Sequence, residues 1–188
     1  MRKYLTFFLA LASACLLGSC SKPAAPTADY NLVATIKDIM DSHVDPSADY
    51  IWQSIGTEVS AEGIKEKRPQ NPEEWKEERR RAMVLVEAAN LLIMPGRNVA
   101  RAHEKSDTPG VELEPAEMQV LIDKDRASFN VRARALHEAG MAATAAADAK
   151  DAQKLFEVGE QIERACEGCH LSYWYPNEKV PPVPGAPR

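Results

Sequence analysis

Five residues near the end of the chain, Cys166-Glu167-Gly168-Cys169-His170, constrain its fold and chemistry more than any other stretch. On a helix, side chains three and four positions apart share one face, so both thiols and the imidazole would project from the same side. Two thiols at this spacing, followed at once by a histidine, form the pattern that attaches a c-type haem. The sequence therefore predicts one covalent haem on Cys166 and Cys169, with His170 as the proximal iron ligand.

Other uses of paired thiols compete with haem attachment. A thioredoxin-like Cys-x-x-Cys motif lies near a βαβ pattern, which this chain lacks. A structural zinc site needs a second pair of ligands, and the sequence contains no second Cys-x-x-Cys and no His-x-x-x-His. A purely structural or chance pairing is the remaining alternative. The export signal at the other end of the chain favours the haem.

That signal begins with the basic residues Arg2 and Lys3 and continues with an apolar run over residues 5–17, which is too short to span a bilayer as a helix. Leu17-Gly18-Ser19-Cys20 then resembles the lipobox of bacterial lipoproteins. In that family the peptide is cut before the cysteine, and the cysteine thiol carries a diacylglyceryl group. The alternative is an ordinary cleaved signal peptide with a stray cysteine.

The lipobox resemblance implies a signal peptide over residues 1–19, a lipidated tether over 20–29 and a periplasmic protein held to a membrane through Cys20. Under the sorting habits of that family, Ser21 favours the outer membrane. The cysteine count agrees: Cys15 leaves with the signal, Cys20 carries lipid, and the last two hold haem. No thiol is then left for a disulfide.

Composition narrows the class of protein and its partners. The 188 residues are 45% hydrophobic and 27% charged, which is typical of one folded domain. The net charge is -5, and removal of residues 1–19 takes away two positive charges and no acid, which leaves -7. An acidic surface argues against nucleic acid and favours redox partner proteins with a basic docking patch. The oligomeric state stays open, a homodimer included.

Apolar periodicity predicts a folded domain over 30–176 and a Pro-rich tail over 177–188, with helices near 30–44 and 46–56, 72–94, 115–147 and 151–174. Asp45-Pro46 marks a break or offset in the first helix. Residues 57–68 fit a small hairpin or an irregular loop equally well. Residues 95–113 form a long connection, which contains His103; no role is assigned to it.

Two further features lie on the predicted helical faces. Asp125 and Arg132 occupy positions on the apolar stripe of the helix predicted over 115–147, where apolar residues are expected. Three interpretations stay open: the two residues form an ion pair, they lie at the surface, or Arg132 faces a haem propionate. Gly159, two turns before Cys166, leaves room on the face that carries the thiols.

The chain resembles the class II cytochromes c, the cytochrome c′ superfamily. The resemblance rests on the late position of Cys166-Glu167-Gly168-Cys169-His170, at the end of the last predicted helix. The resemblance covers roughly residues 30–176. It implies an all-α fold, an antiparallel four-helix bundle with a C-terminal haem attachment motif and one covalent haem.

The family divides by what lies on the other side of the iron. Low-spin members place a methionine of the first helix there, and Met40 occupies a compatible position. His43, one turn later, is the rival ligand. A core methionine that fills space beside the haem is the structural alternative for Met40. High-spin members instead leave the iron five-coordinate and bind small gases.

The function expected is one-electron transfer by a periplasmic, membrane-anchored c-type cytochrome. One alternative is a five-coordinate cytochrome c′ that binds NO or CO. Another is a haem subunit of a larger membrane redox complex. No acid–base pair or activated nucleophile stands out in the sequence, so an enzyme is not expected.

Overall fold

The first helix of the computed structural model, α1 (Ile36–Ile39), begins later than residue 30 because its cap comes later. Thr35 Oγ1 accepts a hydrogen bond from the Asp38 N–H at 3.1 Å, and the Asp38 carboxylate accepts one from the Thr35 N–H at 3.0 Å. This reciprocal capping box fixes the start of the helix. The structure describes residues 30–177. The predicted signal peptide (1–19), Cys20, the tether (20–29) and the tail after residue 177 lie outside the described residues.

The helix continues without interruption through the expected break at Asp45-Pro46. A π-helical turn, η1 (Met40–Val44), leads into α2 (Asp45–Ser54), and the Asp45 N–H donates to the carbonyl of Met40, five residues back. Proline has no N–H, and its ring crowds the carbonyl four residues earlier. A wider turn before Pro46 accommodates both effects, so the chain offsets its helical register instead of breaking.

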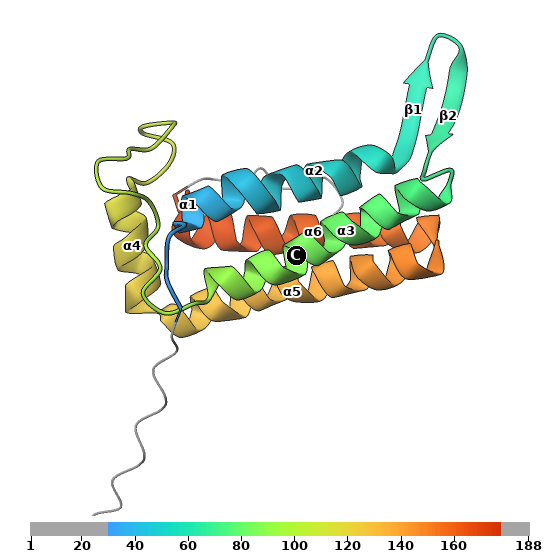
Figure 1. Ribbon diagram of the computed structural model, residues 1–188. Helices are drawn as coiled ribbons and strands as arrows, with labels where there is room; N and C mark the ends of the chain where they lie inside the picture. Colours follow the sequence, from blue (N-terminus) through green and yellow to red (C-terminus); the bar gives the residue numbers. More distant parts are fainter. Residues whose placement is uncertain (1–29, 178–188) are drawn as a thin grey trace, which may run out of the picture. The chain divides into compact units, whose positions relative to one another are not determined.

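The segment after α2, for which the sequence allowed a hairpin or an irregular loop, forms the hairpin. Strands β1 (Gly56–Ser60) and β2 (Gly63–Lys67) pair antiparallel, with Gly56 opposite Lys67 and Ser60 opposite Gly63. Gly63 has a φ of +126°, which side chains disfavour, so glycine suits this turn. The two strands project beyond the ends of α2 and α3 (Figure 1).

Four helices follow in the described chain. Asn71 caps α3 (Pro72–Leu92) through its side chain, and Pro72 lies at the first helical position as the sequence predicts. The single helix predicted over 115–147 is wrong, because it divides into α4 (Pro115–Lys124) and α5 (Arg126–Ala149). The Asp125 carboxylate accepts the Ser128 N–H at 3.0 Å and so caps α5. Asp151 caps α6 (Ala152–Tyr173) in the same way.

The prediction of an all-α antiparallel four-helix bundle is wrong. The described chain is mostly helical, but it contains the two-stranded antiparallel sheet and the separate helix α4. Figure 1 shows α2, α3, α5 and α6 side by side, the hairpin beyond one end of them and α4 beside the other. The division follows from local chemistry, because a capping aspartate ends one helix and starts another, and glycines suit the strand pair.

Small residues set how closely the long helices approach. A Cβ on Gly140 of α5 would lie 2.9 Å from Val86 Cγ2 and 3.1 Å from the Val86 backbone nitrogen of α3. Gly159 of α6 likewise lets α2 pack closely against α6. The Trp52 side chain lies over Gly159 and donates from Nε1 to the Gly159 carbonyl at 3.0 Å. Gly159 therefore makes room for tryptophan.

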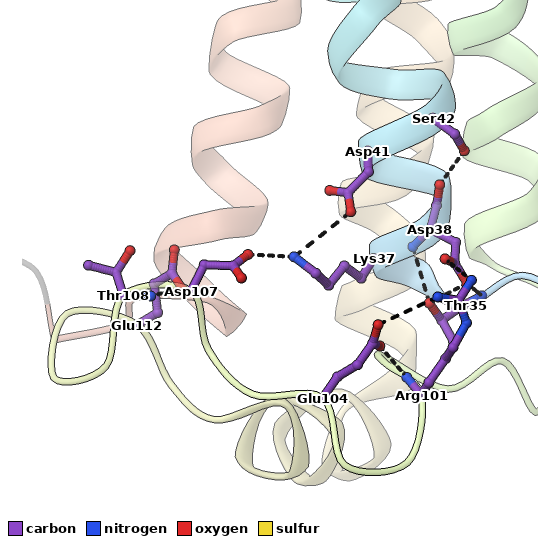
Figure 2. A network of polar contacts seen from close by, with 10 residues as sticks. All are labelled: Thr35, Lys37, Asp38, Asp41, Ser42, Arg101, Glu104, Asp107, Thr108 and Glu112. Atoms are coloured by element: carbon purple, nitrogen blue, oxygen red, sulfur yellow. Dashed lines mark hydrogen bonds and ion pairs between the residues drawn. The ribbon is translucent and has the colours of Figure 1, made fainter.

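The connection over 93–114 is tied to the start of α1. Backbone N–H groups of Ile36 and Lys37 donate to the carbonyls of Asn98 and Val99, both at 2.9 Å. Figure 2 shows Lys37 between Asp107, at 2.5 Å, and Asp41, at 3.8 Å, with the ion pair of Arg101 and Asp38 beside it. Polar contacts of this kind hold the helix that carries Met40. Among residues 30–177, no helix combines the length and apolar character that a membrane crossing requires.

Candidate functional site

The two thiols and the histidine predicted to hold haem meet at one small cavity. Cys166, Cys169 and His170 are partly buried on α6 and line this cavity, whose volume is about 30 Å³. The other lining residues come from η1, α2, α3, α5 and α6, and most are apolar: Met40, Val44, Asp45, Leu92, Phe129, Arg132, Ala133, Leu136 and Ala165.

Burial keeps both thiols protonated. It raises the pKa of Cys166 to about 12, helped by the negative charges of Glu163 and Asp45. Burial also raises the pKa of Cys169 to about 11, against the opposing effect of Arg132. Thiols in this state are poor thiolate nucleophiles, and the described chain has no cluster of three metal-binding side chains. The raised pKa values of both thiols oppose the thioredoxin-like alternative.

The His170 imidazole is favoured in its neutral form, which is the form that binds a metal. Burial lowers its pKa, and the nearby acids Asp45, Glu167 and Glu163 act in the opposite direction. The ring lies against two aromatic side chains, with centroid distances of 5.6 Å to Trp174 and 5.8 Å to Tyr175. Tyr175 also donates to Glu167 at 2.8 Å, so the chain after α6 packs back over the histidine.

The structure separates the two rival distal ligands. Met40 is partly buried and lines the same cavity as His170. His43 is exposed, is not part of the cavity lining, and its Nδ1 lies 2.7 Å from Ser42 Oγ. The π-helical turn begins at Met40 and changes the helical register over these residues, so His43 does not follow Met40 toward α6.

Arg132 reaches the cavity, but it forms no ion pair with Asp125 among the described residues. Asp125 instead binds the Ser128 N–H and hydroxyl, at 3.0 and 2.8 Å. Arg132 lies close to Gly168, where a Cβ would be 3.4 Å from Nη1, and its buried Nε has no hydrogen-bond partner within the described chain. A buried guanidinium nitrogen without an acceptor suits an anionic group of a ligand.

The donor set fits a c-type haem. Two thiols and a histidine share one helical face, a thioether lies across the cavity, apolar side chains surround them, and an unsatisfied guanidinium nitrogen is nearby. The cavity itself holds only about 30 Å³, so a haem there requires the surrounding side chains and helices to move apart.

Sequence reasoning missed two acidic residues. Asp45 lines the cavity, and burial raises the pKa of its carboxyl against the opposing charge of His170, whereas the sequence indicated only a break or offset of the helix at Asp45-Pro46. Glu78 lies on the buried face of α3 and is 1% exposed. The signal for Glu78 was present, because it lies three residues after Trp75 and four before Ala82, on the apolar stripe.

Comparison with known proteins gives no family for the chain: no family model, curated protein or solved structure matches it.

Proposed function

We propose that this protein is a c-type cytochrome that carries one covalent haem on Cys166 and Cys169 and transfers single electrons. The observation that carries the proposal is the shared cavity, which both thiols and His170 line from α6 and Met40 lines from η1. A haem bound there supplies an iron that changes its oxidation state by one electron.

Each residue has a distinct part in this proposal. The two thiols anchor the group through thioether bonds, and the neutral imidazole of His170 binds the iron. The Met40 sulfur would be the second protein ligand of the iron, and a thioether ligand would raise the reduction potential and leave no vacant site. Val44, Leu92 and Leu136 are apolar and exclude water. Arg132 pairs with an acidic group at the edge of the haem.

The charges near His170 support a redox partner with a basic docking patch. Four acids influence the imidazole electrostatically, from α2, the 93–114 connection and α6: Asp45, Glu112, Glu163 and Glu167. Negative potential around the site steers a positively charged partner toward it and accelerates association at low salt. In the proposal, electrons enter and leave at this acidic surface, and no substrate is turned over.

Membrane attachment is part of the proposal and depends on Cys20 alone. A diacylglyceryl group on that cysteine and the tether over 20–29 would hold the cytochrome in the periplasm at a membrane surface. The redox partner would then be found along the same membrane.

Haem retention tests the proposal directly. The protein is produced in a host that attaches c-type haem, denatured and extracted with acidified acetone. The haem should stay with the polypeptide of wild type, and it should move to the organic phase when Cys166 and Cys169 are both changed to serine. Haem recovered in the organic phase from wild type would refute covalent attachment.

Optical spectra then separate electron transfer from gas binding. A low-spin spectrum in both oxidation states, unchanged by carbon monoxide, agrees with an electron carrier whose iron has two protein ligands. A high-spin wild-type protein that binds carbon monoxide rapidly would favour the five-coordinate, gas-binding alternative. Purification in mild detergent tests whether the cytochrome is a subunit of a larger membrane redox complex.

A further inference from the structure

Glu78 is a buried acid without a hydrogen-bond partner, and it lies away from the cavity at Cys166. Its side chain is 1% exposed, and neither carboxyl oxygen makes a hydrogen bond within residues 30–177. Leaving a buried carboxyl unsatisfied costs free energy, and native proteins rarely do so without a reason. The nearby Ser54 hydroxyl donates instead to the Ile51 carbonyl at 2.8 Å.

Glu78 lines a cleft of about 590 Å³. The cleft lies between α2, strand β2 and the start of α3, at the end of the helices where the hairpin projects in Figure 1. Its size is within the range of small-molecule sites. It shares no lining residue with the cavity at Cys166, and most of its lining residues carry polar or charged groups: Tyr50, Gln53, Ser54, Lys65, Glu66, Lys67, Arg68, Pro69, Gln70, Glu74 and Glu78.

Three cationic side chains around this cleft are also without partners. Lys65, Lys67 and Arg68 are exposed, and none forms an ion pair within the described part of the chain. Glu74, by contrast, already accepts hydrogen bonds from the Gln70 N–H at 2.5 Å and the Asn71 side chain at 2.8 Å. The cleft therefore has a buried acid without a hydrogen-bond partner in the described residues and exposed cations that are free to pair with a ligand.

The proton affinity of Glu78 agrees with an unsatisfied, desolvated carboxyl. Burial raises its pKa to about 7, with Glu77 and Glu74 acting in the same direction and Ser54 and Arg81 opposing. The neighbouring Tyr50 shares the effect, because burial and the charge of Glu78 raise its pKa. A group that donates hydrogen bonds to Glu78 would remove much of this desolvation cost.

We infer that the cleft binds a small zwitterion, whose ammonium group donates to Glu78 and whose carboxylate pairs with Lys67 and Arg68. A simple amine would leave Lys67 and Arg68 without a counter-charge, and a simple organic acid would leave Glu78 unsatisfied. A divalent metal ion needs a cluster of ligands that the described residues do not form there. Amino acids and related amino carboxylates have both groups. The inference does not depend on the haem proposal.

A series of ω-amino acids tests the inference on the full-length protein as purified, with or without haem. Glycine, 4-aminobutyrate and 6-aminohexanoate carry an ammonium and a carboxylate at increasing separation, so the series also measures the span of the cleft. Hexanoate and hexylamine are the controls, since each carries only one of the two charges. We expect one chain length to bind saturably at a 1:1 ratio near or below about 1 mM by calorimetry at pH 8. Both single-charge controls should bind at least about tenfold more weakly.

Matched variants locate the binding. Glu78→Gln keeps the shape of the side chain and should weaken the best probe at least about tenfold, and Arg68→Gln should weaken it severalfold. Glu87→Gln and Lys76→Gln remove the same charges from exposed positions of α3 outside the cleft, and they should leave binding unchanged.

Three results would overturn the inference. The first is the absence of saturable binding of any amino acid in the series to wild type. The second is equal binding to wild type and Glu78→Gln, and the third is hexanoate binding as tightly as the zwitterions; either of these two would mean that Glu78 takes no part in binding. Backbone amide shifts of Tyr50 and Arg68 on addition of the best probe provide a second readout that needs no variant.

Discussion

Met40 is the residue whose position decides what the iron of the proposed cytochrome can do. It lines the cavity with His170, whereas His43 is exposed and lies outside it. A thioether on the iron favours electron transfer, because it raises the reduction potential and leaves no open site. The two side chains are on the same helical segment, so substituting them separately tests the assignment without changing the helix.

Substitution of Met40 by alanine should open the sixth coordination position. The methyl group of alanine cannot reach the metal and leaves a space for a diatomic ligand. We expect loss of the near-infrared methionine-to-iron charge-transfer band, a shift to high spin and rapid binding of carbon monoxide. His43→Ala is the matched control and should keep the wild-type spectrum. The opposite pattern, with His43→Ala high-spin and Met40→Ala unchanged, would assign the ligand to His43.

Glu78 should make the folded protein less stable as the pH rises. Its folded-state pKa of about 7 lies above its ordinary value of 4.5, so between these values the folded state keeps a proton that the unfolded state releases. This contribution to stability is full below about pH 4.5 and is lost by about pH 7. Denaturant unfolding of Glu78→Gln, which has no such proton, should show a relative gain over wild type of roughly 2–3 kcal/mol across that range.

The charged groups near Glu78 are Glu74, Glu77 and Arg81, and all three remain in the variant. Glu87→Gln, at an exposed position of the same helix, should follow the wild-type pH dependence. If the stability curves of Glu78→Gln and wild type stay parallel from pH 4.5 to 8, the carboxyl of Glu78 is not the source of the pH dependence.

At the scale of whole elements, the closest approach is between α3 and α5. Gly140 allows it, because a Cβ there would lie 2.9 Å from Val86 Cγ2, 3.1 Å from the Val86 nitrogen and 3.2 Å from the Ala82 carbonyl oxygen. Two of these three neighbours are backbone atoms, which cannot rotate away. The distance between the two helices therefore depends on this one glycine.

Gly140→Ala should destabilise the protein, although alanine is the better helix former. The gain in helix propensity is about 1 kcal/mol, and forcing two packed helices apart costs more, so we expect a net loss of about 1–3 kcal/mol. Gly159→Ala is the comparison, since its nearest neighbour is the Trp52 side chain at 3.3 Å, and it should cost less. Denaturant midpoints measure both. A Gly140→Ala protein as stable as wild type would show that α3 and α5 are free to separate.

At the scale of the whole molecule, the proposed location depends on a residue far from the haem motif. Lipid on Cys20 and a tether over 20–29 would keep an otherwise water-exposed, acidic protein at a membrane surface. Two acyl chains are enough for stable attachment without a membrane-spanning helix.

Cys20→Ala should abolish this attachment without changing the haem. We expect the variant to be released in the soluble fraction or to keep its signal peptide unprocessed, while wild type stays with the membranes after a high-salt wash. Mass spectrometry of the mature wild type should find acylated Cys20 as its first residue. A wild-type protein that starts elsewhere and is freely soluble would disprove the lipoprotein assignment.

Local patterns determine several features of the fold, because short-range contacts decide them. The cap at Asn71 and the proline after it set the start of α3, and Asp151 sets the start of α6. The segment over 57–68 was compatible with a hairpin or a loop, and the structure forms the hairpin. The spacing of Cys166, Cys169 and His170 places them on one face of any helix.

Tertiary packing decided what local patterns left open or made appear otherwise. The division at Asp125 is local, since its capping bond reaches Ser128, but the helical spacing over 115–147 hid it and the expected bundle is not formed. Which of Met40 and His43 approaches α6 depends on the packing of the first helix, and only Met40 lines the cavity there. Glu78 is an acid on an apolar stripe, and it is buried because neighbouring helices cover it. The sequence pattern of one helix contains no information about those neighbours, so it cannot tell a solvated acid from a buried one.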